Sequence, residues 1–229
     1  MTIRHHPADT TILAYAAGGL SGALAAITAT HLAMCPECRT RLRAAEAMGG
    51  DLIHSGCEAQ VAYDSLARVF DRIDDLADDP VNAALDAVAL DNVASGDLPS
   101  DLVAHHVPAP LGRLLPADLD SLRWRTLGPG IRQAQVISDS DAVRLLRIAP
   151  GRAVPHHGHR GQEMTLILSG SYTDEIGRFQ AGDIADLDPD VRHQPVSDSD
   201  VDCVCIIATD APLAFTGIVP RLLQPFVGI

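Results

Sequence analysis

The chain has 229 residues, of which 47% are hydrophobic and 21% charged, and this balance excludes wholesale disorder. Asp and Glu number 30 against 17 for Lys and Arg, so the net charge of −13 argues against binding to a phosphate backbone. The chain has no Lys, which excludes lysine Schiff-base and P-loop chemistry.

Helical spacing of apolar residues runs through the first 95 residues. Asp9 and Ser21 are expected to cap the first two helices, and Gly49-Gly50 is expected to end the third. The predicted helices run over about residues 9–17, from Ser21 through His31, over 35–48, over 58–78, and from Pro80 onward.

The pattern changes after a stretch rich in Pro and Gly, residues 96–120, which is the predicted linker. From about residue 121, short β runs such as 143–148, 164–168 and 201–208 alternate with turn residues, which predicts a β-sandwich or small barrel with Trp124 in its core. The predicted domains are therefore residues 1–95 and 121–229, joined by residues 96–120.

Neither a leader nor a membrane span is predicted. The residues after Met1 lack an apolar h-region, and Gly, Ser and Thr dilute the apolar stretch 12–29. We therefore expect a cytoplasmic protein. In that reducing compartment the 5 Cys residues favour metal binding or redox chemistry over structural disulfides.

A first set of metal-binding residue types lies near the N-terminus. His31 and Cys35 are four positions apart and can share a helical face, and Cys38 can reach the same ion from the next turn. Tetrahedral zinc needs one more ligand. His6 can supply it if the first helix folds back, and His5 is an adjacent alternative. A redox Cys-x₂-Cys motif is the competing interpretation, but the βαβ context of such motifs is absent.

The pattern His6-x₂₄-His31-x₃-Cys35-x₂-Cys38 resembles the signature of the zinc-binding anti-sigma family at every position. The resemblance covers residues 1–50 closely, and the two later helices complete the usual four-helix domain. It implies a protein that binds an ECF (group IV) sigma factor and keeps it from RNA polymerase.

A second set lies in the β segment. A His-x-His pair on a strand, His157 and His159, places both side chains on one sheet face, Glu163 begins the next strand, and His193 can approach from a later one. Three imidazoles and one carboxylate suit Zn, Fe, Mn or Ni. His156 is expected to point away.

These residues resemble the first cupin motif at every defined position, from Gly151 to Gly170. Residues 182–193 resemble the second motif with departures, since Asp188 and Asp190 stand where the family has Pro and Gly. A zinc anti-sigma domain followed by a cupin barrel is the arrangement of ChrR-type anti-sigma factors. That resemblance implies inhibition by the helical domain and relay of a singlet-oxygen or organic-hydroperoxide signal by the cupin domain.

The expected function is therefore a transcriptional regulator without catalytic residues or an organic cofactor, bound to its sigma factor in a 1:1 complex, with no nucleic-acid or membrane contact of its own. Zinc is expected at His6, His31, Cys35 and Cys38, and zinc or another divalent transition metal at the cupin site. Cys203 and Cys205 are candidate redox residues, because both thiols of a Cys-x-Cys on a strand face one side; a pair of buried core residues is the competing interpretation. The alternative function is a metal-dependent cupin dioxygenase or isomerase with a zinc-stapled helical appendage.

Overall fold

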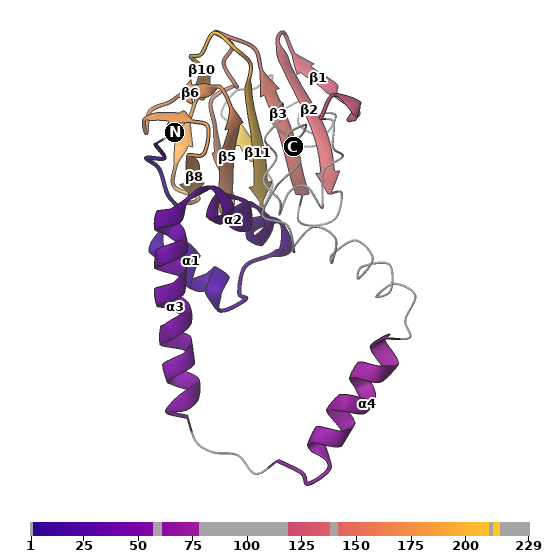
Figure 1. Ribbon diagram of the computed structural model, residues 1–229. Helices are drawn as coiled ribbons and strands as arrows, with labels where there is room; N and C mark the ends of the chain where they lie inside the picture. Colours follow the sequence, from indigo (N-terminus) through magenta and orange to yellow (C-terminus); the bar gives the residue numbers. More distant parts are fainter. Residues whose placement is uncertain (1, 57–60, 78–118, 138–141, 211–212, 216–229) are drawn as a thin grey trace. The chain divides into compact units, whose positions relative to one another are not determined.

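The computed structural model describes residues 2–56, 61–77, 119–137, 142–210 and 213–215 (Figure 1). The chain divides into two compact units, one comprising Met1–Asp51 with His105–Ile229 and the other Leu52–Ala104. The predicted helix from Pro80 and nearly all of the predicted linker lie outside the described residues, so the domain boundaries remain predictions.

Three N-terminal helices begin in the first unit: α1 (Asp9–Ala16), α2 (Gly22–Met34) and α3 (Pro36–His54). The expected cap at Ser21 is confirmed, because its side chain accepts a hydrogen bond from the Leu24 N–H. The expected cap at Asp9 is wrong. Ala8 occupies the N-cap position, and the Asp9 carboxylate instead forms an ion pair with Arg41.

The expected end of the third helix is also wrong, because α3 continues through Gly49 and Gly50 to His54. A glycine ends a helix when it takes the left-handed conformation at the C′ position. Gly18, which follows α1, has φ of 69°, whereas neither Gly49 nor Gly50 has a positive φ. These two glycines therefore weaken the helix without ending it.

In the second unit, α4 spans Ser65–Ala77 and begins later than the predicted residue 58. The Asp64 carbonyl accepts the first helical hydrogen bond from the Arg68 N–H, and the Asp64 side chain forms an ion pair with the Arg68 guanidinium. Asp is a favoured residue at a helix start, which accounts for the position of this boundary.

The predicted change to β structure is confirmed, and the three predicted runs correspond to β3, β5 and β11. A short 3₁₀ helix, η2 (Leu119–Ser121), precedes the strands. The strands are β1 (Arg125–Gly128), β2 (Ile131–Ile137), β3 (Ala142–Ile148), β4 (His157–His159), β5 (Glu163–Ser169), β6 (Ser171–Thr173), β7 (Arg178–Gln180), β8 (Ile184–Leu187), β9 (Arg192–His193), β10 (Val196–Ser197), β11 (Cys203–Thr209) and β12 (Leu213–Phe215).

The strands form a six-stranded antiparallel sheet in the order β1-β2-β3-β11-β5-β8 and two three-stranded sheets, β10-β6-β7 and β12-β4-β9. Gly170 joins β5 to β6 with φ of 70°, and a Cβ there would lie 2.6 Å from the Asp202 carbonyl oxygen. Glycine is required at this turn for both reasons.

Both faces of the central strands β5 and β11 are buried, whereas β1 at the edge of the sheet has exposed residues. Side chains alternate between the two faces along each strand. On β11, Val204 and Ile206 join one apolar cluster and Cys203 and Cys205 join the other. The second cluster also holds Tyr172 and other residues of the barrel interior.

Helix α2 packs against β5 and β11 on the face of this sheet that is opposite the barrel interior, at the lower end of the strands in Figure 1. Its residues Ala23, Leu24 and Ile27 lie in the same buried cluster as Met164 of β5 and Ile206 of β11. Trp124 also packs against this cluster, as expected, and its indole N–H donates to the Leu119 carbonyl. The helical segment and the barrel therefore share one core.

Among the described helices, none combines the length and apolar character that crossing a bilayer requires.

Candidate metal centres

The first centre collects four side chains from three places in the chain. His6 lies in the segment before α1, His31 near the end of α2, Cys35 between α2 and α3, and Cys38 in the first turn of α3. Their ligand atoms all lie within 4.8 Å of one another. The structure thus brings the four predicted residues together.

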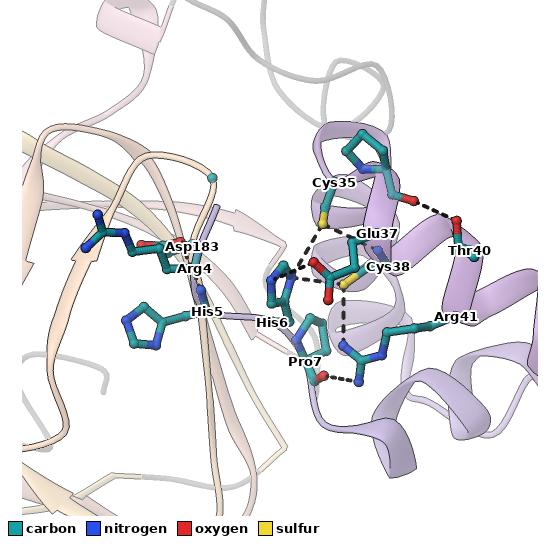
Figure 2. Close-up of polar contacts among 12 residues, drawn as sticks. Arg4, His5, His6, Pro7, Cys35, Glu37, Cys38, Thr40, Arg41 and Asp183 are labelled. Carbon is teal, nitrogen blue, oxygen red and sulfur yellow. Dashed lines mark hydrogen bonds and ion pairs between the residues drawn. The ribbon is translucent and has the colours of Figure 1, made fainter. Parts of the chain in front are cut away.

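The distances within this centre fit tetrahedral zinc. His6 Nδ1 lies 3.4 Å from Cys35 Sγ and 3.2 Å from Cys38 Sγ (Figure 2). His31 Nε2 lies 3.3 Å from Cys38 Sγ. With Zn–S bonds of about 2.3 Å and Zn–N bonds of about 2.0 Å, ligand atoms at the corners of a tetrahedron stand roughly 3.3–3.8 Å apart. These residues could hold zinc with little movement.

His5 does not take part in this centre. Its ring lies 4.2 Å from that of Phe179, and its Nε2 lies 3.1 Å from the Arg178 carbonyl oxygen. The alternative left open by the sequence, that His5 replaces His6, is not what the geometry shows.

Groups around the ligands orient them. His31 Nδ1 lies 3.0 Å from the Gly182 carbonyl oxygen, which can only accept, so Nδ1 carries the proton and Nε2 is free to bind a metal. His6 presents Nδ1 to the thiols, and its Nε2 lies 3.6 Å from a Glu37 carboxylate oxygen. Arg41 donates to Cys38 Sγ and to the Pro7 carbonyl (Figure 2).

Burial favours the neutral forms of His31 and Cys38, two of the four ligands. It lowers the pKa of His31 to about 4. Burial and the neighbouring Cys35 thiol raise the pKa of Cys38 to about 12, although Arg41 acts in the opposite direction. A dication between the two sulfurs would stabilise the thiolates that burial alone disfavours.

The second centre lies in the barrel. His157 and His159 occupy the ends of β4, Glu163 is the first residue of β5, and His193 on β9 pairs directly with His157. The four ligand atoms lie within 4.8 Å of one another, and all four residues are buried. The structure brings together this predicted set as well.

Two of these imidazoles have a fixed acceptor at Nδ1. His193 Nδ1 lies 2.8 Å from Asp174 Oδ2, and His157 Nδ1 lies 2.8 Å from the Pro155 carbonyl oxygen. Each therefore carries its proton on Nδ1 and leaves Nε2 available to a metal. Sequence reasoning missed Asp174, because it lies in a turn 19 residues before His193 and no spacing rule joins them.

The charge of Glu163 and the unpaired ring nitrogens of two histidines in this centre suit a divalent metal. The neighbouring His159 imidazole holds the pKa of Glu163 below its ordinary value even though burial acts to raise it, and burial lowers the pKa of His157. The carboxylate is thus ionised beside the His157 imidazole, whose neutral form burial favours. His159 Nε2 and His193 Nε2 are buried without a hydrogen-bond partner, as expected of atoms placed to bind a metal.

The departures in the second cupin motif do not displace its histidine. Asp188 accepts a hydrogen bond from the Asp190 N–H through its side chain, and its carbonyl accepts from the Val191 N–H. Such an Asx turn needs no Pro or Gly. The chain then enters β9 with His193 buried, while the neighbouring His156 lies 3.7 Å from the Glu175 carboxylate instead of entering the centre.

Cys203 and Cys205 face the barrel interior on β11 and are both buried free thiols. The hydrogen bond between the two side chains, together with burial, raises the pKa of Cys205 well above its ordinary value. Cys57, which the sequence assigned no role, lies outside the described residues. The redox role of the pair remains a prediction.

A chain with one buried His₂Cys₂ cluster on helices and one buried His₃Glu cluster in a cupin-like barrel is a two-centre protein of the zinc-finger and cupin class. Two family descriptions match it separately: residues 11–39 match a putative zinc-finger, and residues 115–212 match the ChrR cupin-like domain. The zinc-finger match begins after His6.

Two comparisons that cover the whole chain or nearly all of it, with ChrR and with its complex, agree with these matches. The chain is 43% identical over 230 residues to the anti-sigma-E factor ChrR of Cereibacter sphaeroides, covering 100% of both chains. It also matches the structure of Rhodobacter sphaeroides SigE in complex with the anti-sigma ChrR, with 41% identity, 91% of this chain and 100% of that chain covered, and a TM-score of 0.72. An RmlC-like cupin protein from Ralstonia eutropha is 19% identical, over 44% of this chain and 71% of its own, with a TM-score of 0.40.

The chain belongs to the ChrR family of anti-sigma factors. The resemblance stated from the sequence is thereby confirmed. Membership places the chain among transcriptional regulators and not among metal-dependent cupin enzymes, the alternative that the sequence left open.

Proposed function

We propose that this chain binds one ECF sigma factor in a 1:1 complex in the cytoplasm, keeps it from RNA polymerase, and releases it under oxidative stress such as singlet oxygen or organic hydroperoxide. The observation that carries the proposal is full-length relationship to ChrR, which has been crystallised with SigE.

The proposed contact surface is an apolar stripe on α4, formed by Leu66, Val69, Phe70 and Ile73. Their spacing of three and four positions places them on one helical face, and their exposed fractions are 67%, 54%, 56% and 52%. Four large apolar side chains exposed together on a helix are typical of a surface that packs against a partner. The exposed Asp71 on the same helix suits a basic partner surface.

We assign zinc to His6, His31, Cys35 and Cys38, where it holds α2 and α3 in the shape that presents the helical region to the sigma factor. A structural zinc ion is suited to this role because it is closed by four protein ligands and contributes directly to folding. We assign zinc or another divalent transition metal to His157, His159, Glu163 and His193.

The barrel is the proposed signal input, and the metal centre is the better candidate within it. Its four ligand atoms converge on one point, whereas the raised pKa of Cys205 disfavours the thiolate that an oxidant attacks. Oxidant chemistry at the barrel would weaken the complex through the contacts that join the barrel to the helical segment.

The decisive experiment is co-expression of the full chain with each ECF sigma factor of its own genome, followed by purification of a 1:1 complex. The full chain is used because α2 shares a core with the barrel. We expect Phe70→Ala with Ile73→Ala to weaken the complex at least about 30-fold, as for residues at the centre of an interface, and Cys35→Ser with Cys38→Ser to abolish it.

Val201→Ala is the matched control, because Val201 is 58% exposed but lies on the barrel. It should bind as the unsubstituted chain does. Failure to purify with any sigma factor would refute the proposed function, and equal binding by the Phe70/Ile73 variant would refute the α4 surface alone.

A further inference from the structure

The residues just before His6 are bound to one turn of the barrel, the β7–β8 turn (residues 181–183). The Asp183 Oδ1 atom accepts hydrogen bonds from the N–H groups of Arg4 and His5, at 2.6 and 3.1 Å. The His5 carbonyl in turn accepts from the Ile184 N–H at 3.2 Å. Figure 2 shows Asp183 beside Arg4, next to the segment that leads to His6.

A second aspartate holds the other side of His6. The Asp186 Oδ2 atom accepts from the Ala8 N–H at 3.0 Å and from the Thr11 hydroxyl at 2.6 Å. His6 therefore lies between two points at which the chain is bound to β8 or to the turn before it. The backbone around this ligand cannot shift without breaking contacts to the barrel.

The same turn also holds the second histidine. The Gly182 carbonyl accepts from His31 Nδ1, and Gly182 has φ of 91°, a conformation that other residues rarely adopt. The N-terminal pair of imidazole ligands is thus oriented by one short stretch of the barrel and not by the helices alone.

Asp183 is the centre of this arrangement. It is fully buried, and besides the Arg4 and His5 N–H groups it accepts the Gln180 N–H at its other oxygen. A buried carboxylate with three backbone donors fixes both the turn and the segment that crosses it. The sequence signature of the zinc site ends at Cys38, so it does not include Asp183.

We propose that Asp183 is a positioning residue for the N-terminal metal site, so that the barrel itself sets how tightly that site binds zinc. The connection also reaches the barrel centre, because β8 continues from Asp186 to Leu187, which pairs with the ligand Glu163. The inference rests on the proposed zinc site, but its test reads metal affinity and is independent of any sigma factor.

The test is Co²⁺ binding to the full chain in competition with a chelator. Only the N-terminal site has sulfur ligands, so the sulfur-to-cobalt charge-transfer band reports that site separately from the barrel site. We expect Asp183→Asn, which leaves one oxygen to accept where two accepted, to weaken Co²⁺ binding there about 10- to 100-fold, the usual effect of losing a group that orients a ligand. The wavelength of the sulfur-to-cobalt charge-transfer band should shift as well, because the ligand geometry changes.

Two further variants complete the design. Thr11→Val removes the hydroxyl donor to Asp186. If Asp183→Asn does not fold, this variant tests whether contacts to the barrel set the metal affinity, and we expect Co²⁺ binding at the N-terminal site to weaken at least about threefold. Asp200→Asn, at an exposed carboxylate elsewhere on the barrel, should change nothing. Affinity within twofold of the unsubstituted chain in the folded variants, or equal weakening of both metal sites, would overturn the proposal.

Discussion

The ligand histidines of both centres show how single residues outside the ligand set decide their chemistry. Three ligand histidines each present Nδ1 to an oxygen acceptor: His31 to the Gly182 carbonyl, His157 to the Pro155 carbonyl, and His193 to the Asp174 carboxylate. In each ring the acceptor selects the tautomer whose Nε2 can bind a metal. The carboxylate at His193 is the strongest of these acceptors.

Removal of that carboxylate yields a first prediction. Asp174→Asn should lower the affinity of the barrel centre for its metal about 10- to 100-fold, because His193 loses the charged acceptor that fixes its tautomer and its orientation. Chelator competition with Zn²⁺, monitored separately for each site, measures this. The N-terminal centre should be unaffected, and a loss confined to that centre would contradict the assignment of Asp174.

The buried thiols of β11 yield a second prediction. Cys203 and Cys205 should remain unalkylated when the folded chain is treated with iodoacetamide at pH 8, since both are buried and the raised pKa of Cys205 leaves it protonated. Mass spectrometry of the peptide containing both residues, with the urea-unfolded chain as the fully reactive control, reads the result. Rapid modification in the folded state would instead support an accessible redox pair.

At the scale of the element, the burial of the central strands and the continuity of α3 through its glycines have separate physical causes. β11 reads as an apolar run up to Thr209, and β5 is buried from Glu163 to Ile167, because α2 packs on one face of these strands and the barrel interior covers the other. α3 contains two glycines in its interior and still continues, because its backbone stays right-handed there.

A third prediction follows for α3. Gly49→Ala and Gly50→Ala should each stabilise the helix by up to about 1 kcal/mol, because a Cβ at either position meets no atom within 4 Å and alanine favours the helix. Gly18→Ala, at a positive φ after α1, should destabilise instead. Circular dichroism during urea unfolding distinguishes the two signs, and stabilisation by Gly18→Ala would show that the φ value is not decisive.

At the scale of the whole molecule, the helical segment and the barrel are coupled through a common core. Ile27 of α2 is fully buried among residues of β5 and β11, and Trp124, the only Trp in the chain, packs against the same cluster. We therefore expect the helical segment and the barrel to unfold together.

The fourth prediction tests this coupling. Ile27→Ala should lower the free energy of unfolding by about 2–5 kcal/mol and shift the Trp124 fluorescence transition and the helical circular dichroism transition together. The matched control is Ile53→Ala on α3, where the side chain is 84% exposed and the change should be within about 0.5 kcal/mol. A shift of the helical signal alone would indicate separate units.

Much of the candidate chemistry could be predicted from residue types and spacing. Cys35 follows His31 by four positions and precedes Cys38 by three, and His157 and His159 lie on one strand, so short-range spacing brings each group together. Helix boundaries were less predictable: Asp9 was bound by Arg41 instead of capping α1, and such a long-range ion pair leaves no local signal.

The sequence by itself determined the ligand types, the change from helical to β periodicity and the family resemblance, because these depend on short-range spacing. Only the tertiary structure decided that His6 and not His5 completes the first centre, that Asp174 orients His193, and that Asp183 and Asp186 bind the N-terminal segment to the barrel. These contacts join residues that are 19 to 179 positions apart, so no local spacing rule reveals them, and those of Asp183 and Asp186 form between the N-terminal segment and the barrel on which α2 also packs.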